Sequence, residues 1–296
     1  MKRTLIILVT FVACLAALGA QARDPVAEAV ARYFNDWPAN GRIIPQEDVV
    51  AKVAAGEAMT LLDIRSAADY ARGHLRGAIN LPWGTAALAE NLRHIPQSGQ
   101  VFVYCFTGQT SGQAVALLNM AGVPAQSVRL GWNLGISRVA GVENVTSTTG
   151  TALDTSRIFT VNPALEAAYR AYYSDMAGKV GTRFANNIIV EAEAKRLLDS
   201  GDRRITFVSI QRPADFAAAR IEGAVNIPWG RAMHEQFGTL PARNTLIVYC
   251  YTGQTAGQTV AALRLLGYDA VSLRGGMGMP VNVPQGWANQ GLPVVR

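Results

Sequence analysis

The sequence predicts an α/β protein made of two copies of one domain, each a central parallel sheet flanked by helices on both faces. Three observations predict this class. The chain repeats itself, short apolar runs alternate with helical patterns in each copy, and each copy carries one cysteine between an apolar run and a helical pattern. Short buried strands that alternate with helices are typical of parallel sheets covered on both faces.

The N-terminal segment predicts export. Residues 1–22 begin with a basic pair, Lys2 and Arg3, continue with an apolar stretch and end in "AQA", which has the small residues of a signal-peptide cleavage site. We therefore expect a cleaved signal peptide and a periplasmic or secreted protein. The apolar stretch is short for a membrane span, so stable membrane insertion is not expected. Cys14 lies inside that stretch, which disfavours a lipoprotein.

Three blocks of sequence occur twice, in the same order and at nearly constant spacing. "YARGHLRGAINLPWG" pairs with "FAAARIEGAVNIPWG", "YCFTGQTSGQ" with "YCYTGQTAGQ", and "VRLGWNLGI" with "VSLRGGMGM". Upstream, "AVARYFNDW" is echoed by "AYRAYYSDM". We predict a first domain over 23–142, a Thr/Ser/Gly-rich linker over 143–160 and a second domain over 161–296.

The expected strands and helices follow one another in the same order in both copies. The strands are "MTLLDIR", "VFVYC" and "SVRL" in the first copy, and "ITFVSIQ", "TLIVYC" and "AVSL" in the second. The helical patterns "SGQAVALLNMAG" and "AGQTVAALRLLG" have apolar spacing near 3.6 residues and close on Gly122 and Gly267. Each cysteine is thereby placed at the carboxyl end of a central strand, where parallel sheets hold their ligands.

The cysteine loops suit anionic sulfur. In an exported protein the pair Cys105 and Cys250 is compatible with a disulfide. Each, however, lies in the same strand–loop–helix context, where backbone amides and a helix dipole converge on one point. Gly108 and Gly253 permit the backbone angles that such a loop needs. The loop would stabilise a thiolate, which is the nucleophilic form of cysteine, or a persulfide. We therefore expect two reactive thiols that are not bridged to each other.

Taken together, these segments resemble the rhodanese family. "LLDIRSAADYARGHLRGAINLP" followed by "VFVYCFTGQTSGQAVALLNMAG" carries the resemblance, which covers 42–136 and, in the second copy, 183–279. The chain thus resembles a tandem-domain rhodanese. This implies two rhodanese-like domains and a sulfurtransferase that needs no cofactor. The loop cysteine would take sulfane sulfur from a small donor (thiosulfate, polysulfide or persulfide) and pass it to a thiol or cyanide.

The resemblance also implies roles for individual residues. Cys105 and Cys250 would carry the sulfur, and Asp63 and Arg65 would support the first loop. The persulfide would be held by the loops, whose members are Phe106, Thr107, Gly108, Gln109, Thr110 and Ser111 in the first copy and Tyr251, Thr252, Gly253, Gln254, Thr255 and Ala256 in the second.

The loops depart from many single-domain rhodaneses, which have Arg where Thr110 and Thr255 stand here. They resemble the Cys-x-x-Gly-x-Thr type of mercaptopyruvate sulfurtransferases and some thiosulfate sulfurtransferases. Neither loop has an Arg or Lys to bind a dianion such as thiosulfate through charge-assisted hydrogen bonds. We therefore expect chain-like donors to be preferred, unless a cation such as Arg129 or Arg274 comes from elsewhere in the fold.

The two copies also differ from each other. Asp63 and Arg65 become Ser209 and Gln211 in the second copy, which predicts that the first site is the more active. His74 is absent from the second copy, and we interpret it as a structural residue because persulfide chemistry needs no separate base once the thiol is ionised.

Other function classes find less support. The net charge is +6 at pH 7, but basic residues are scattered, which argues against nucleic-acid binding. Two isolated cysteines and three histidines show no metal-ligand spacing. A phosphatase of the same fold would need a loop one residue longer that ends in Arg. The alternative that stays open is a non-enzymatic periplasmic sulfur carrier or binding module that delivers persulfide to an exported protein.

Overall fold

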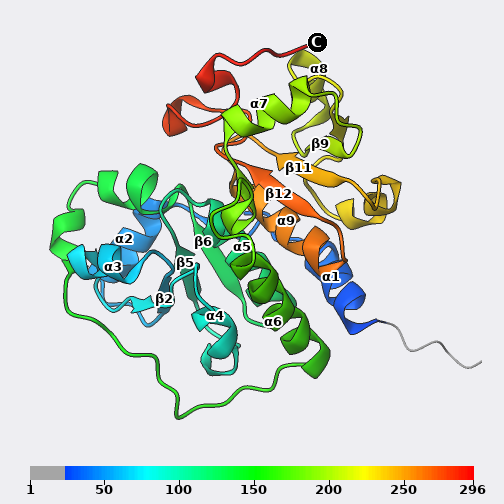
Figure 1. The fold of residues 1–296 in the computed structure, drawn as a ribbon. Coiled ribbons are helices and arrows are strands. Elements are labelled where there is room, and N and C mark those ends of the chain that lie inside the picture. The colour runs from blue at the N-terminus through cyan, green and yellow to red at the C-terminus, as the bar shows by residue number, and fades with distance from the viewer. Residues whose placement is uncertain (1–23) are drawn as a thin grey trace, which may run out of the picture.

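The computed structural model, which describes residues 24–296, contains two five-stranded parallel sheets with helices around them (Figure 1). The α/β class and the two-copy architecture predicted from the sequence are confirmed. The expected signal peptide at 1–22 lies outside the described residues. Within the part of the chain that the structure describes, no helix has the length and apolar character needed to cross a membrane.

The first sheet has the strand order β1-β6-β5-β2-β4. Its strands, given in chain order, are β1 (Ile43–Ile44), β2 (Thr60–Asp63), β4 (Ile79–Asn80), β5 (Val101–Tyr104) and β6 (Ala125–Val128). Its helices are α2 (Gln46–Ala54), α3 (Ala67–Arg72), α4 (Ala87–Glu90) and α5 (Gln109–Met120). All four residues of the central strand β5 are buried, as expected of a parallel strand covered on both faces. Cys105 follows that strand directly.

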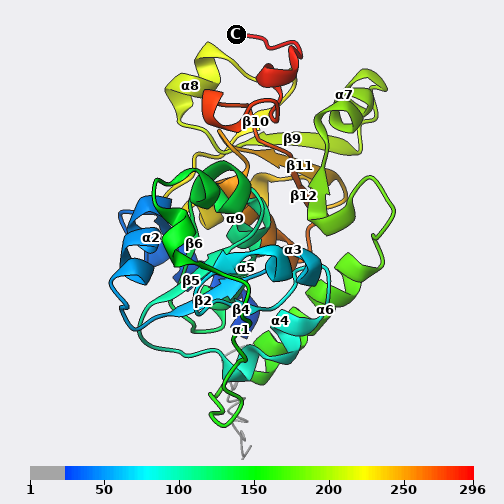
Figure 2. The ribbon, with the colours of Figure 1, turned by 90° about the vertical axis from the view of Figure 1, so that its left-hand side faces the viewer.

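The second sheet repeats this order as β8, β12, β11, β9 and β10 from one edge to the other. Its strands are β8 (Ile188–Ile189), β9 (Ile205–Ser209), β10 (Val225–Asn226), β11 (Thr245–Tyr249) and β12 (Ala270–Leu273). Its helices are α7 (Glu191–Asp199), α8 (Pro213–Ala218) and α9 (Gln254–Leu265). Cys250 follows β11 as Cys105 follows β5. Figure 2 shows the second sheet above the first, with α5 and α9 between them.

Two further helices, α1 (Pro25–Asn35) and α6 (Pro163–Ala177), lead into the two repeats. Both begin in the same way, because the side chains of Asp24 and Asn162 accept a hydrogen bond from the second helical amide and a proline follows each cap. This shared start agrees with the similarity between the sequences of the two helices.

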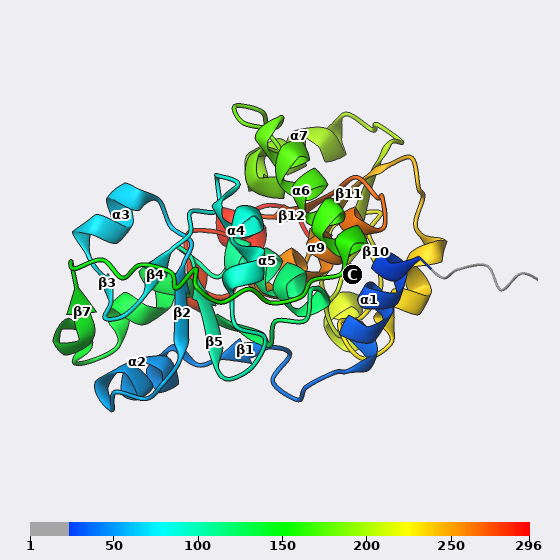
Figure 3. The same cartoon turned by 90° about the horizontal axis from the view of Figure 1, so that it is seen from below.

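Each of these leading helices packs on its own repeat and also on the other one. Phe34 of α1 makes edge-on contact with Trp229 and Phe237 of the second repeat, with ring centroids 5.9 and 5.6 Å apart. Tyr173 of α6 contacts Trp83 of the first repeat at 5.3 Å. One continuous apolar core therefore includes residues of both repeats. In Figure 3, α5 and α9 lie in the middle of the molecule with α1 and α6 beside them.

The helices that follow the cysteine loops touch at their first turns. A Cβ atom added to Gly112 of α5 would lie 2.3 Å from the carbonyl oxygen of Gln254, and one added to Gly257 of α9 would lie 2.3 Å from that of Gln109. Real Cβ atoms do not approach an oxygen so closely, so only glycine allows this contact. The cysteine loops of the two repeats are consequently neighbours across the interface.

The segment predicted as a linker is partly ordered against the first repeat. β7 (Thr146–Ser147) pairs with β3 (His74–Leu75) in a two-stranded antiparallel sheet. Figure 1 shows the chain after β7 running along the lower edge of the first repeat toward α6. The domain limits expected from the sequence follow chain order, whereas α1 and α6 each pack across them.

Remaining turns of the described chain are short. They comprise 3-10 turns at Leu92–His94, Ile136–Arg138, Val142–Val145, Ala185–Asn187, Met233–Thr239, Pro280–Asn282 and Ala288–Gln290, and a π-helical turn at Gly131–Gly135.

The packing of α1 on the second repeat predicts the effect of Phe34→Ala. Phe34 is completely buried among aromatic rings of the second repeat. Its truncation should lower the free energy of unfolding by about 3–5 kcal/mol, because it removes apolar contacts and leaves a cavity. Denaturant unfolding measures this, and Ile158→Ala serves as control because Ile158 is 71% exposed. A loss below about 1 kcal/mol at Phe34 would contradict this packing.

Candidate active site

Both loop cysteines are free and buried, each with 2% of its surface exposed. The expectation that Cys105 and Cys250 are not bridged to each other is confirmed. Each lies between the carboxyl end of a central strand and the first turn of a helix, so the sulfur faces the helix N-terminus.

One backbone amide in each loop donates to the sulfur. The amide of Gly108 lies 3.1 Å from Cys105 Sγ, and the amide of Gly253 lies 3.0 Å from Cys250 Sγ. Both glycines have a positive φ, +92° and +93°, which residues with a side chain rarely adopt. Glycine at this position therefore turns the amide toward the sulfur. Such a donor stabilises a negatively charged sulfur more than a neutral thiol.

The third repeated block of sequence, residues 128–136 and 271–279, forms hydrogen bonds with the side of each cysteine loop that faces away from the sulfur. The amide of Trp132 donates to the carbonyl of Cys105 at 2.8 Å, and that of Met277 donates to the carbonyl of Cys250 at 2.7 Å. The preceding glycine has a positive φ in both copies, and a Cβ on Gly131 would lie 2.6 Å from the Cys105 oxygen. Because C=O and N–H of one peptide point in opposite directions, binding the carbonyls outside leaves the following amides on the sulfur side.

Asp63 and Arg65 form a buried ion pair behind the first loop. Arg65 Nη2 lies 2.6 Å from Asp63 Oδ2, and the guanidinium stacks 4.2 Å from the centre of the Trp132 ring. Arg65 also donates to the carbonyl of Gly73 at 2.7 Å. The pair thus contacts the residue whose amide binds the Cys105 carbonyl. Burial and the nearby Asp63 carboxylate raise the pKa of Tyr104 well above its usual range, so its hydroxyl stays neutral beside this pair.

The second repeat has a different arrangement at the same place. Ser209 and Gln211 replace the ion pair. The backbone amide of Gln211 donates to Ser209 Oγ at 3.3 Å, and Ser209 Oγ donates to Gln211 Oε1 at 3.4 Å. The loop residue Tyr251 has a side-chain partner here, because its hydroxyl donates a hydrogen bond to the carboxylate of Asp215. That bond, together with one from Arg212, holds the pKa of Asp215 below its usual range.

His74 is buried away from the chemistry. Its Nδ1 lies 2.8 Å from the carbonyl oxygen of Tyr70, and its Nε2 lies 3.0 Å from that of Thr149. Both ring nitrogens are therefore engaged by backbone, which supports the structural interpretation of this residue.

A cavity of about 370 Å³ lies at the second loop and has walls from both repeats. The second repeat contributes Cys250, Tyr251 and Thr255, and the first contributes Ile43, Gln46, Arg129 and Leu130. Arg129 is half exposed. Its guanidinium donates hydrogen bonds to Gln46 Oε1 at 3.1 Å and to Glu47 Oε2 at 3.3 Å. The loop itself has no cation, but the neighbouring repeat places one in the wall of its cavity.

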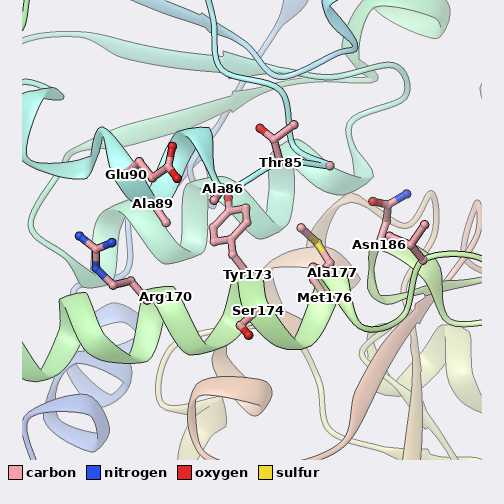
Figure 4. A pocket seen from close by; sticks show the side chains of 12 residues that line it. Thr85, Ala86, Ala89, Glu90, Arg170, Tyr173, Ser174, Met176, Ala177 and Asn186 are labelled. Atoms are coloured by element: carbon pink, nitrogen blue, oxygen red, sulfur yellow. The ribbon is translucent and has the colours of Figure 1, made fainter.

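The first loop borders a cavity of about 380 Å³. Phe106 and Thr110 line it together with Trp83 of the same repeat and Asn186 of the second repeat. A further cavity of about 250 Å³ adjoins this one at Thr85 and lies between α4 and α6, where Tyr173 and Met176 line it (Figure 4). The further cavity is mainly apolar and contains no cysteine.

The sequence does not indicate that each repeat contributes residues to the other's site. Gln109 and Gln254, expected as loop residues, direct their side chains across the interface to the ends of β12 and β6. From the sequence, Arg129 is only one of two cations that could bind a dianionic donor from outside the loops. The signal available in the sequence was the duplication itself, since two similar domains often form a pseudosymmetric pair.

Comparison with known proteins agrees with this geometry. A family model described as "Rhodanese-like domain" matches residues 46–135 and again residues 190–278, together more than half of the chain. The "Probable adenylyltransferase/sulfurtransferase MoeZ" of Mycobacterium tuberculosis is 27% identical over 180 residues, which are 53% of this chain and 44% of that protein. This chain thus spans less than half the length of that relative.

Two more proteins illustrate the likeness. A "Sulfurtransferase" of Allochromatium vinosum is 33% identical over 79 residues, which are 27% of this chain and 72% of that protein. Among solved structures, SseA of Escherichia coli, titled a 3-mercaptopyruvate sulfotransferase, is 18% identical with a TM-score of 0.36, and the match covers 78% of this chain and 97% of that one. The family model and the sulfurtransferase relatives support sulfur transfer in general. The chain belongs to the rhodanese family, with one rhodanese-like domain in each of its two repeats.

Proposed function

We propose that the protein is a sulfurtransferase that moves sulfane sulfur from a small donor to a thiophilic acceptor through a cysteine persulfide. The observation that carries the proposal is the amide hydrogen bond to each buried cysteine sulfur, from Gly108 to Cys105 and from Gly253 to Cys250. Family membership gives this geometry its chemical meaning. The signal peptide expected at 1–22 supports a donor and an acceptor outside the cytoplasm.

The reaction has two displacement steps. The cysteine thiolate attacks the outer sulfur of thiosulfate, the sulfur–sulfur bond of the donor breaks, and sulfite leaves with the electron pair. The product is a cysteine persulfide anion. An acceptor such as cyanide then attacks the terminal sulfur, and the cysteine leaves as a thiolate. The cysteine carries negative charge on sulfur both as a thiolate and as a persulfide, so the loop amides would stabilise both forms.

Supporting residues act through the loop rather than on the sulfur. In the first repeat, Asp63 and Arg65 would hold Trp132 in place, and Trp132 holds the Cys105 carbonyl. The non-enzymatic alternative, a carrier that passes persulfide only to a partner protein, uses the same loops. Multiple turnover with a free acceptor would favour the enzyme, and stoichiometric transfer only to a protein would favour the carrier.

The proposal predicts sulfur loading on the loop cysteines. After treatment with thiosulfate or polysulfide, the intact mass should rise by one sulfur atom for each active site, and cyanide should remove it. Cys105→Ser and Cys250→Ser should each lose the increment of one site. Intact mass spectrometry measures this. If the double variant still gains cyanide-labile sulfur, the assignment of the cysteines is wrong.

Arg129 should decide how well the second site uses thiosulfate. In a Cys105→Ser background, Arg129→Met removes the cation from the cavity wall at Cys250. Loss of a charge-assisted hydrogen bond, about 1.5–3 kcal/mol, should raise KM for thiosulfate roughly ten- to a hundredfold. Arg129→Lys, which keeps the charge, is the matched control and should retain much of the affinity. Steady-state kinetics with thiosulfate and with an organic persulfide separate the two effects, and an equal loss with both donors would contradict the role of the cation.

A further inference from the structure

Gln254 belongs to the second cysteine loop but makes its hydrogen bonds in the first repeat. Its Nε2 donates to Ser127 Oγ at 2.7 Å and to the carbonyl of Val128 at 3.2 Å, and its Oε1 accepts from the amide of Leu130 at 3.3 Å. The side chain is buried. It is therefore fixed at the end of β6, beside the first cysteine loop.

The contact continues to Cys105 through two serines. Ser127 Oγ lies 2.9 Å from Ser111 Oγ, and Ser111 Oγ lies 3.4 Å from Cys105 Sγ. Both serines are fully buried, so water does not compete for these hydroxyls. A hydrogen-bonded chain thus joins Gln254 of one repeat to the cysteine of the other.

The chemistry of the amide sets the direction of this chain. An amide nitrogen can only donate, so Ser127 accepts from Gln254 and keeps its own hydrogen for Ser111. With one lone pair of Ser111 occupied in this way, the Ser111 hydrogen is directed to the carbonyl of Gly108, which lies 3.0 Å away, or to the sulfur. The neutral thiol donates to Ser111, whereas a thiolate or persulfide accepts from it. Ser111 thereby becomes a second donor to the anionic sulfur, next to the Gly108 amide.

At the second site the equivalent chain of hydrogen bonds is incomplete. Gln109 makes the mirror-image contacts, from its Nε2 to Ser272 Oγ at 2.5 Å and to the carbonyl of Leu273 at 2.9 Å. Ala256, however, stands where the first loop has Ser111. With no hydroxyl at that position, the chain ends at Ser272 and does not reach Cys250.

We propose that Gln254 is a positioning residue for Cys105: from the loop of the other repeat it orients Ser127 and Ser111 so that Ser111 donates to the anionic sulfur. Through Gln254 the second loop thereby changes the reactivity of Cys105, whereas the first loop has no corresponding effect on Cys250. The part that concerns persulfide rests on the proposed function, but the part that concerns the thiolate does not.

The test follows the reactivity of one cysteine at a time. In a Cys250→Ser background, alkylation of Cys105 by iodoacetamide is measured as a function of pH. Gln254→Met keeps the size of the side chain but removes the donor, so the midpoint of the profile should move upward by roughly half to one pH unit. Ser127→Ala should do the same. Because both substitutions interrupt the same chain of hydrogen bonds, combining them should not move the midpoint of the alkylation profile further.

The repeat provides matched controls. Ser272→Ala, followed on Cys250 in a Cys105→Ser background, removes the equivalent buried hydroxyl from the equivalent cross-repeat contact and should leave the Cys250 midpoint in place. Ala256→Ser should extend the chain to Cys250 and lower its midpoint. An unchanged Cys105 midpoint in Gln254→Met, or equal shifts from Ser127→Ala and Ser272→Ala, would overturn the proposal.

Alkylation needs no sulfur donor, so its outcome is independent of turnover. If the protein fails to transfer sulfur but Gln254→Met shifts the Cys105 profile, the positioning role stands and the proposed function fails. If sulfur is transferred but the profile does not move, the positioning role fails alone.

Discussion

The contact between the first turns of α5 and α9 is the constraint on which the rest of the structure depends. Gly112 and Gly257 lie against each other's loop carbonyls, and any side chain there would force the helices apart. Since both helices begin at a cysteine loop, this contact also fixes the separation of the two sites. Helices α1 and α6, which each pack on both repeats, then surround the contact with a common apolar core. Separate folding of the two repeats would leave the aromatic faces of both leading helices exposed, which is costly in water.

The composite construction explains why two nearly identical loops lie in unequal surroundings. The second cavity has a wall from the first repeat, whereas Asn186 is the residue of the second repeat that lines the first cavity. The second cavity has the Arg129 cation in its wall, and the first cysteine has the Ser111 hydroxyl at its sulfur. One of these differences lies inside the repeated loop, where Ala256 of the second copy stands in place of Ser111. The ion pair of Asp63 and Arg65 adds a third difference, behind the loop rather than in front of it.

The sequence was sufficient to predict what is local. Apolar runs and helical spacing predicted the strands, the helices after each cysteine and the position of both sulfurs at the carboxyl edge of a sheet. The packing of these helices across the two repeats could not be predicted in this way, because the spacing of apolar residues in α1 identifies a buried face but not its partner. Trp83 and Trp229 are equivalent, so either leading helix could have packed on either repeat. Gln254 likewise gave no signal, since a polar loop residue is usually solvated or bound to a ligand.

We propose that each loop holds an anionic sulfur on its cysteine through backbone amides, and that a side-chain hydroxyl donor is added only at the first site. A crystal structure of the protein after treatment with a sulfane donor tests this most directly. We expect an additional sulfur atom on Cys105, with Gly108 N and Ser111 Oγ within hydrogen-bonding distance of the persulfide. On Cys250 we expect loop amides, including that of Gly253, to be the donors. Unmodified cysteines in loaded crystals, or an added sulfur that points away from the loop amides, would contradict it.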